Sequence, residues 1–332
     1  MRKLLTPLFL GILIGCAEQS SRDDDRPDPL EPILNMMSPD VPEELPKADD
    51  APGLRQKGNG FFAVGDYDQA IAWYTMSLQA KEDAKTYFNR GVAYMANDEI
   101  DKALADYDKA IQLEPNAPSP WINRGLLLKS KGKTAEGIND LTKAMALDAK
   151  DPAIALNRGL LYLSVDMFDR AIEDFSKAIE LDGKYVDAFI NRGFAQHRKK
   201  QYAAAVKDFD EALKLDPENV LAYSNRGNAY TQMGQGDKAV ADLSEAIRRE
   251  ERDPQLFNNR GTAHGVKGDH QRALADFTRA IELAPDFAAA YRNRGLAQHT
   301  LKQADRARED FAIALKLEPN VTENIPGDYL MK

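Results

Sequence analysis

Residues 89–91 read Asn-Arg-Gly, and this tripeptide returns six more times at one fixed spacing. The seven copies begin 34 residues apart, at Asn89, Asn123, Asn157, Asn191, Asn225, Asn259 and Asn293. A constant period of this length is the sequence signature of stacked helix-turn-helix repeats. The chain is therefore expected to be all-α, with two helices in each repeat and each repeat packed on the next.

The other recurring residues explain how the two helices of a repeat can pack. When positions are numbered so that the glycine is eighth, alanine recurs at positions 20 and 27 and a large apolar residue at position 24, as in Ala171, Ala178 and Phe175. Small residues let helices approach closely, and the large one fills the space between them. This pattern resembles the tetratricopeptide repeat family over about 270 residues. The resemblance implies a right-handed superhelical solenoid of about eight repeats with a concave, ligand-binding groove.

The array is expected to span residues 53–321, followed by a C-terminal tail over residues 322–332. A degenerate copy over residues 51–83 carries Gln-Lys-Gly in place of Asn-Arg-Gly, and terminal repeats are often atypical because one face has no neighbour. Proline cannot continue a helix. Four prolines are expected to end second helices: Pro115, Pro217, Pro285 and Pro319.

The N-terminal residues 1–15 are expected to be a signal peptide, with Arg2 and Lys3 before an apolar run too short to span a bilayer. The run ends in Leu-Ile-Gly-Cys, which resembles the lipoprotein box of bacteria. That resemblance implies cleavage before Cys16 and acylation of Cys16, which is the only cysteine of the chain. The alternative is an ordinary cleaved signal followed by an incidental cysteine.

Residues 16–52 are expected to hold the lipidated Cys16 and a disordered tether. Residues 17–52 contain seven prolines and eleven acidic against three basic residues, and such a segment cannot bury enough apolar surface to fold. Ala17 stands where the lipoprotein family would carry an aspartate for retention at the inner membrane. The resemblance thus implies a lipid-anchored protein of the bacterial cell envelope, at the periplasmic face of the outer membrane.

Composition and motifs argue against several other classes. The tether carries most of the net charge of −9, so the repeats are nearly neutral and lack the basic stripe of a nucleic-acid-binding protein. The four histidines have no metal-ligand spacing, and a zinc site would need further ligands. No catalytic constellation is present, so neither an enzyme, a cofactor nor a small-molecule substrate is expected.

The seven asparagines stand at position 6 of the first helix, on the face that the family resemblance identifies as the concave groove. A primary amide can donate to a backbone carbonyl and accept from a backbone N–H. Stacked helices lie about 8–10 Å apart, and an extended chain rises about 3.3 Å per residue. One asparagine would therefore face every third residue of a bound peptide, as in the asparagine ladders of long arrays in this family. The alternative is a purely structural role.

Arginine follows each asparagine at position 7, on the side that packs, where a charged residue needs a partner. Aspartate recurs at position 23, seven times at the same period. Pairing within a repeat leaves no member unpaired, so we expect Arg90 with Asp106 and so on through Arg294 with Asp310. A row of arginines that binds an anionic ligand is the weaker alternative.

Apolar residues line the expected groove in the N-terminal half of the array and polar residues in the C-terminal half. The expected apolar pockets are formed at positions 5 and 9 by Phe88, Ile122, Leu156, Ile190 and Phe194. An apolar half beside a polar half suits an amphipathic segment of a partner. Alternatively, the apolar half closes against the tether or another subunit.

The sequence thus favours a membrane-anchored adaptor that binds an extended peptide or partner protein in its groove. It resembles envelope lipoproteins of this repeat class that recruit proteases or cell-wall hydrolases. The alternative is a pilotin-like or other assembly factor that escorts one secretion or outer-membrane component. Fold-level analogy carries much of this interpretation.

Overall fold

The computed structural model describes residues 47–322 and 324–330, and within these residues the chain is all-α, as expected. They form sixteen α-helices in eight helix-turn-helix repeats, without a strand. The chain divides into two compact units, residues up to 148 and residues from 149 onward. The expected signal peptide, Cys16 and the tether up to residue 46 lie outside the described residues.

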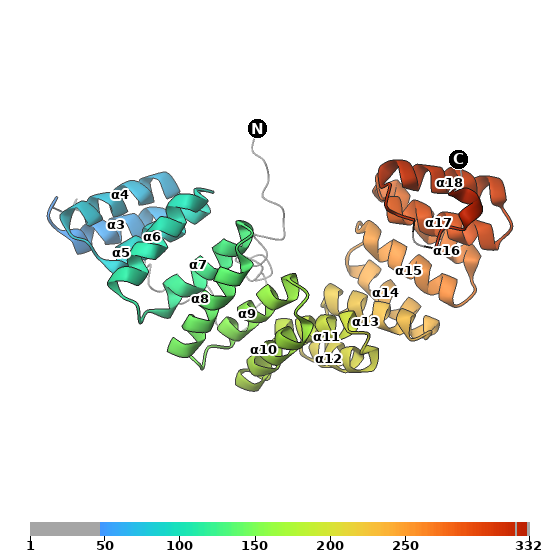
Figure 1. Ribbon diagram of the computed structural model, residues 1–332, viewed down its shortest axis with the longest axis horizontal. Coiled ribbons are helices and arrows are strands. Elements are labelled where there is room, and N and C mark those ends of the chain that lie inside the picture. Colours follow the sequence, from blue (N-terminus) through green and yellow to red (C-terminus); the bar gives the residue numbers. More distant parts are fainter. Residues whose placement is uncertain (1–46, 323, 331–332) are drawn as a thin grey trace. The chain divides into compact units, whose positions relative to one another are not determined.

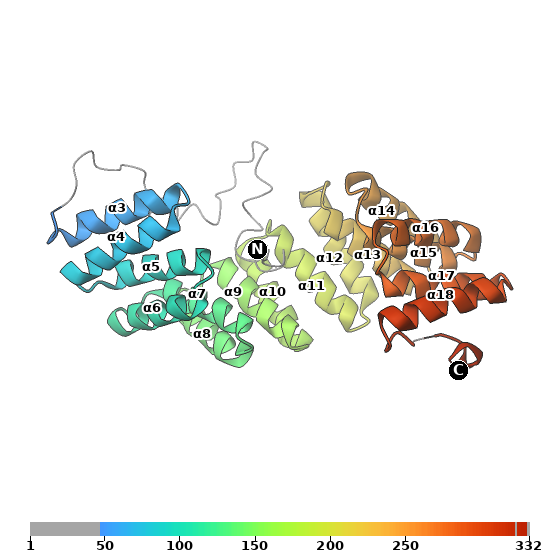
Figure 2. The ribbon, with the colours of Figure 1, turned by 90° about the horizontal axis from the view of Figure 1, so that it is seen from above.

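The first unit holds repeats 1 to 3. Their helices are α3 (Ala51–Ala63), α4 (Tyr67–Ala80), α5 (Ala84–Ala96), α6 (Ile100–Leu113), α7 (Pro118–Ser130) and α8 (Thr134–Leu147). Each second helix lies against the first helix of its own repeat, and α4 and α6 also contact the first helix of the next repeat (Figures 1 and 2).

The second unit holds repeats 4 to 8. Their helices are α9 (Pro152–Ser164), α10 (Phe168–Leu181), α11 (Val186–Arg198), α12 (Tyr202–Leu215), α13 (Val220–Gln232), α14 (Gly236–Arg249), α15 (Pro254–Val266), α16 (His270–Leu283), α17 (Ala288–Thr300) and α18 (Ala304–Leu317). Successive first helices of this unit, from α9 to α17, contact one another. They therefore form a continuous wall within the unit.

The glycine at position 8 sets how closely the two helices of a repeat approach. In repeat 5, a Cβ built on Gly193 would lie 2.7 Å from the ring of Phe209, the position-24 residue. Phe209 is fully buried between Ala205 and Ala229. The small residues and the large one therefore play the roles that the sequence predicts.

The turn between the two helices of each repeat needs a residue with positive φ at position 15. Glycine supplies it in four repeats, for example Gly132 at +73°. In the other four repeats the residue is aspartate or lysine, such as Asp166 at +57° and Lys200 at +61°. A left-handed residue stops the first helix and lets the chain reverse.

Helix α3 begins two residues earlier than the expected start of the array, inside the segment 16–52 predicted to be a tether. Asp50 caps this helix, since its Oδ1 accepts a hydrogen bond from the Gly53 amide at 3.1 Å. Pro52 lies in the first turn, where proline's missing N–H costs nothing and its fixed φ suits a helix. Pro52, which was expected to belong to the tether, therefore lies in the first turn of α3.

The expected C-terminal tail is partly structured. Within its described residues, η1 (Gly327–Tyr329) is a short 3-10 helix. The side chains of Val321 and Ile325 are 7% and 6% exposed and pack on the last repeat. The tail is therefore part of the folded second unit.

Gly193→Ala is predicted to destabilise the chain by about 1–3 kcal/mol, because the added methyl group overpacks against Phe209. Gly265, also helical, has no heavy atom within 4 Å of a built Cβ. Gly265→Ala is therefore expected to be neutral or stabilising by up to about 1 kcal/mol. Urea unfolding of both variants measures the difference. Equal effects would show that position 8 does not limit the helix approach.

Candidate functional site

The seven asparagines at position 6 are all half-buried, each on the first helix of its repeat. In the second unit five of them follow one another on contacting helices α9, α11, α13, α15 and α17. A ladder that binds a peptide backbone needs the N–H and the oxygen of each amide to be open to a ligand. The hydrogen bonds of these asparagines within the chain show that this holds for only some of them.

In the first unit, both asparagines interact with neighbouring polar groups. Asn89 Nδ2 donates to Asn59 Oδ1 at 3.0 Å, and the Tyr74 hydroxyl donates to the same oxygen at 2.8 Å. Asn123 hydrogen-bonds the Tyr107 hydroxyl. Burial raises the pKa of Tyr107, and this effect outweighs the hydrogen bond from Asn123, which lowers the pKa. These two amides help to hold the helices together.

In the second unit, the amides differ from one repeat to the next. Asn191 Nδ2 donates to the Asp187 carbonyl at 2.8 Å, and Asn293 Nδ2 donates to Asn258 Oδ1 at 2.9 Å. Asn259 Oδ1 accepts from a glutamine one turn earlier at 2.7 Å. Within the described part of the chain, the side-chain amides of Asn157 and Asn225 have no hydrogen-bond partner. These two are the amides most open to a ligand.

Two of the five residues expected to line apolar pockets are buried. Leu156 and Ile190, at position 5, are only 7% and 6% exposed. Ile190 belongs to an interior cluster with Phe189 and Leu213. A helical wheel places position 5 on the groove face, but the cluster that buries Ile190 includes Ala212 and Leu213 of α12 and Ala222 of α13. Phe88, Ile122 and Phe194 remain half-buried on the first helices of their repeats.

The arginine at position 7 binds the aspartate at position 23 of its own repeat in all seven expected pairs. Nε and Nη2 of each arginine bind the two carboxylate oxygens at 2.6–2.9 Å. The aspartate side chains are 5–10% exposed and the arginines 16–22%. The predicted pairing within repeats is therefore confirmed.

The same arginine also binds the preceding repeat, which the sequence argument missed. Its Nη1 donates to a side-chain oxygen at position 25 of that repeat, at 2.6–3.2 Å. Within the two units, these contacts join Arg90 to Thr75, Arg124 to Asp108, Arg192 to Ser176, Arg226 to Asp210, Arg260 to Ser244 and Arg294 to Thr278. We call this three-residue contact the arginine bridge.

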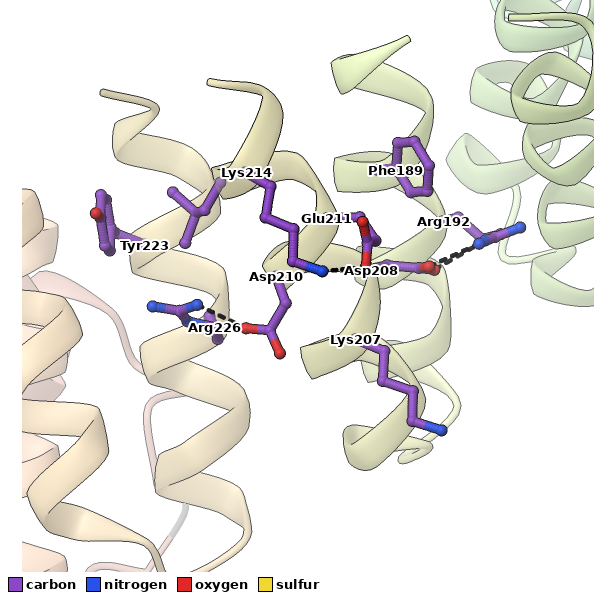
Figure 3. A pocket seen from close by; sticks show the side chains of 10 residues that line it. Phe189, Arg192, Lys207, Asp208, Asp210, Glu211, Lys214, Tyr223 and Arg226 are labelled. Atoms are coloured by element: carbon purple, nitrogen blue, oxygen red, sulfur yellow. Dashed lines mark hydrogen bonds and ion pairs between the residues drawn. The ribbon is translucent and has the colours of Figure 1, made fainter. Parts of the chain in front are cut away.

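Figure 3 shows parts of two arginine bridges beside α12. Arg192 on α11 reaches Asp208, while Arg226 on α13 reaches Asp210 on the other side of the same helix. Each guanidinium also stacks on an aromatic ring one turn earlier, with Arg226 5.6 Å from the centre of the Tyr223 ring. The hydrogen bonds that Arg226 donates to Asp242 and to Asp210 raise the pKa of Arg226 above its usual range. The arginine is therefore permanently charged and fully engaged.

The ends of the array lack half of the bridge. Repeat 1 has Lys57 at position 7 and Trp73 at position 23, and repeat 8 has Ala312 at position 25. Within the described residues, the bridge is thus present where one repeat meets the next. It is incomplete in the first repeat, which no repeat precedes there, and in the last repeat, which no repeat follows there. This pattern supports a structural rather than a ligand-binding role for the arginine row.

No group of three or more His, Cys, Asp or Glu side chains in the described residues is arranged to hold a metal ion. None of the helices in the described ranges has both the length and the apolar character needed to cross a bilayer.

The helical repeats and the row of asparagines on their first helices define a class of protein, the helical repeat scaffolds that bind proteins or peptides. Family models for the tetratricopeptide repeat match residues 84–117, 118–151, 153–185, 220–253 and 254–287, and a TPR repeat model matches 197–234. These matches cover more than half of the chain, which belongs to the tetratricopeptide repeat family.

The similarity to individual relatives covers a short stretch of repeats and not the whole length of either protein. Sperm-associated antigen 1 of Rattus norvegicus is 44% identical over 59 residues, which are 18% of this chain and 7% of that protein. The chain covers a tenth or less of the first curated relatives.

Two solved structures are similar in fold. A tetratricopeptide repeat protein from Parabacteroides merdae has a TM-score of 0.58 and 21% identity, over 75% of this chain and 98% of that one. PilF of Pseudomonas aeruginosa has a TM-score of 0.55 and 15% identity, over 66% and 97%.

Arg192→Leu is predicted to destabilise the second unit by about 3–5 kcal/mol, because it leaves buried Asp208 without its partner. Adding Asp208→Leu should recover most of this loss, since two apolar residues can replace a buried ion pair at little cost. Ser176→Ala leaves the Arg192–Asp208 pair intact and removes the contact with the preceding repeat, together with the bond from Ser176 Oγ to the Ile172 carbonyl, and should cost about 0.5–1.5 kcal/mol. A double-mutant cycle by urea unfolding measures the coupling. Additive effects of the two leucine variants would contradict the bridge.

Proposed function

We propose that this protein is a scaffold that binds an extended segment of a partner protein along the first helices of its repeats. One observation carries the proposal, the row of half-buried asparagines on successive, contacting first helices of the second unit. A structural role explains Asn293, which binds Asn258, but gives no reason for Asn157 and Asn225. Amides without a partner in the chain are suited to hydrogen-bond a peptide backbone.

The neighbours of these asparagines favour weak, sequence-tolerant binding with local selectivity. Half-buried Phe194 offers apolar contact near Asn191, whereas Asn228 and Thr262 are polar on the following helices. Each hydrogen bond contributes about 0.5–1.5 kcal/mol net, and ordering each residue of a flexible peptide costs about 1–2 kcal/mol. Backbone contacts alone therefore give little affinity. Side chains that contact the apolar part of the wall supply the rest.

The proposal also places the scaffold at a membrane through acylated Cys16, with the acidic segment before the repeats as its tether. The support for this part is the resemblance of residues 13–16 to a lipoprotein box behind an apolar, basic-flanked run. Several acyl chains on one residue would anchor a protein firmly, whereas one chain binds only marginally. In a bacterium with two membranes, Ala17 favours the outer one.

Binding is tested with a photo-crosslinking amino acid placed in living cells on the inner wall at exposed Thr262, or on the second helix α12 at exposed Lys207. The proposal predicts a protein adduct from Thr262 that is absent from Lys207. Adducts from Lys207 alone would place the binding surface on the second helices instead.

Replacing Asn157, Asn191 and Asn225 together by alanine should then weaken that adduct strongly, by an expected tenfold or more if about 1.4 kcal/mol is lost. The melting temperature should change little, because two of the three amides have no partner in the chain. The matched control replaces one exposed second-helix residue in each of the same repeats, Glu173, Lys207 and Lys238. Equal adduct yields from the two triple variants would exclude the asparagine row.

Cys16→Ser is predicted to release the protein from membranes, because an unacylated chain has no other anchor in this proposal. Fractionation after a high-salt wash, with metabolic labelling by a fatty acid, measures the effect. A variant that stays in the membrane fraction would refute anchoring through Cys16 while leaving peptide binding open.

A further inference from the structure

The last repeat is covered by a segment that is not a repeat. Residues 321–330 follow α18 and place three side chains against its outer face. Ile325 packs on Ala307 and Phe311, at positions 20 and 24 of repeat 8. Tyr329 meets the Phe311 ring edge-on at 4.9 Å between ring centres.

These contacts copy those made elsewhere in the second unit by the first helix of the next repeat. Where a following repeat exists, the alanine at position 10 of its first helix packs on positions 20 and 24, as Ala229 does on Ala205 and Phe209. Ile325 takes that place on the last repeat. Val321 packs on Ala314 at position 27, as position-3 Leu256 packs on Ala246.

Tyr329 fixes the segment on the side of the inner wall. Its hydroxyl lies 3.1 Å from Nδ1 of His299, at position 12 of α17, and the two rings are perpendicular. The guanidinium of Arg308 lies 5.9 Å from the centre of the same ring. The segment is therefore held by the apolar side chains of Val321 and Ile325 and by the aromatic contacts of Tyr329, rather than by helix packing along its length.

We propose that residues 321–330 act as a plug on a docking surface for a second copy of this chain. The surface beneath the plug has the residue pattern by which second helices of this chain bind its own first helices. It is therefore complementary to a first helix of another copy. This inference does not depend on the proposed peptide binding.

The arginine bridge selects which helix of the second copy would dock. Ala312 offers no oxygen at position 25, so a first helix with arginine at position 7 would bury an N–H group without an acceptor. Helix α3 carries Lys57 instead, and a lysine can direct its charge into water. The occupant is thus α3 of the second copy. Such a head-to-tail contact is heterologous and builds rings or open chains, so masses beyond a dimer are expected.

The test compares the full chain with a chain that ends at Asn320, both carrying Cys16→Ser so that lipid does not drive association. Sedimentation velocity over a wide concentration range should show a constant mass for the full chain. The shortened chain should rise about twofold or more in mean mass. A synthetic peptide of residues 318–332 should reverse the rise, and the same peptide with Ile325→Asp should not.

Further variants identify the occupant and guard against local unfolding. In the shortened chain, Ala312→Asp should strengthen association through Lys57, and Lys57→Ala should cancel that gain. Full-length Ile325→Ser, which keeps the rest of the segment, should also associate more than the parent. A shortened chain of constant mass would overturn the proposal, and so would association that the peptide leaves unchanged. A closed dimer insensitive to Lys57→Ala would overturn the choice of α3.

Discussion

The rest of this structure depends on the arginine bridge, because this polar contact recurs along the described repeats and joins both helices of a repeat to the repeat before it. A guanidinium held at 16–22% exposure must have its donors satisfied. One carboxylate satisfies two of them, and the neighbouring repeat satisfies a third. Burial of the charge is therefore acceptable only when the two repeats are correctly stacked.

Because the buried arginines must be satisfied by correctly stacked repeats, the opposite face of the first helices can carry polar side chains. Apolar contacts between first and second helices are small and repetitive, with alanines around one large residue such as Phe209. The bridge adds a directional contact that fixes the register of adjacent repeats. The first helices are then positioned by interactions on their packed side, and side chains such as Asn225 remain available on the other. In a repeat array, nearest-neighbour contacts set the stability.

Much of this was predictable from the sequence, because the 34-residue period reports on helix pairing. The pairing of Arg192 with Asp208 follows from two rows with the same period and no unpaired member. The position-25 contact was missed because its residues differ in type, such as Asp210 and Ser176, and share only an oxygen. Burial of Ile190 was missed because a helical wheel treats one helix at a time. The plug formed by Ile325 and Tyr329 has no period, so no repeat argument could find it.

Hydrogen exchange of the Arg226→Leu variant tests most directly whether the bridge couples neighbouring repeats. Arg226 lies on α13 and binds Asp242 of its own repeat and Asp210 on α12 of the preceding one. The account predicts faster amide exchange in α12 as well as in α13 and α14, with α17 and α18 unchanged. Acceleration confined to α13 and α14, with α12 protected as in the parent, would contradict it.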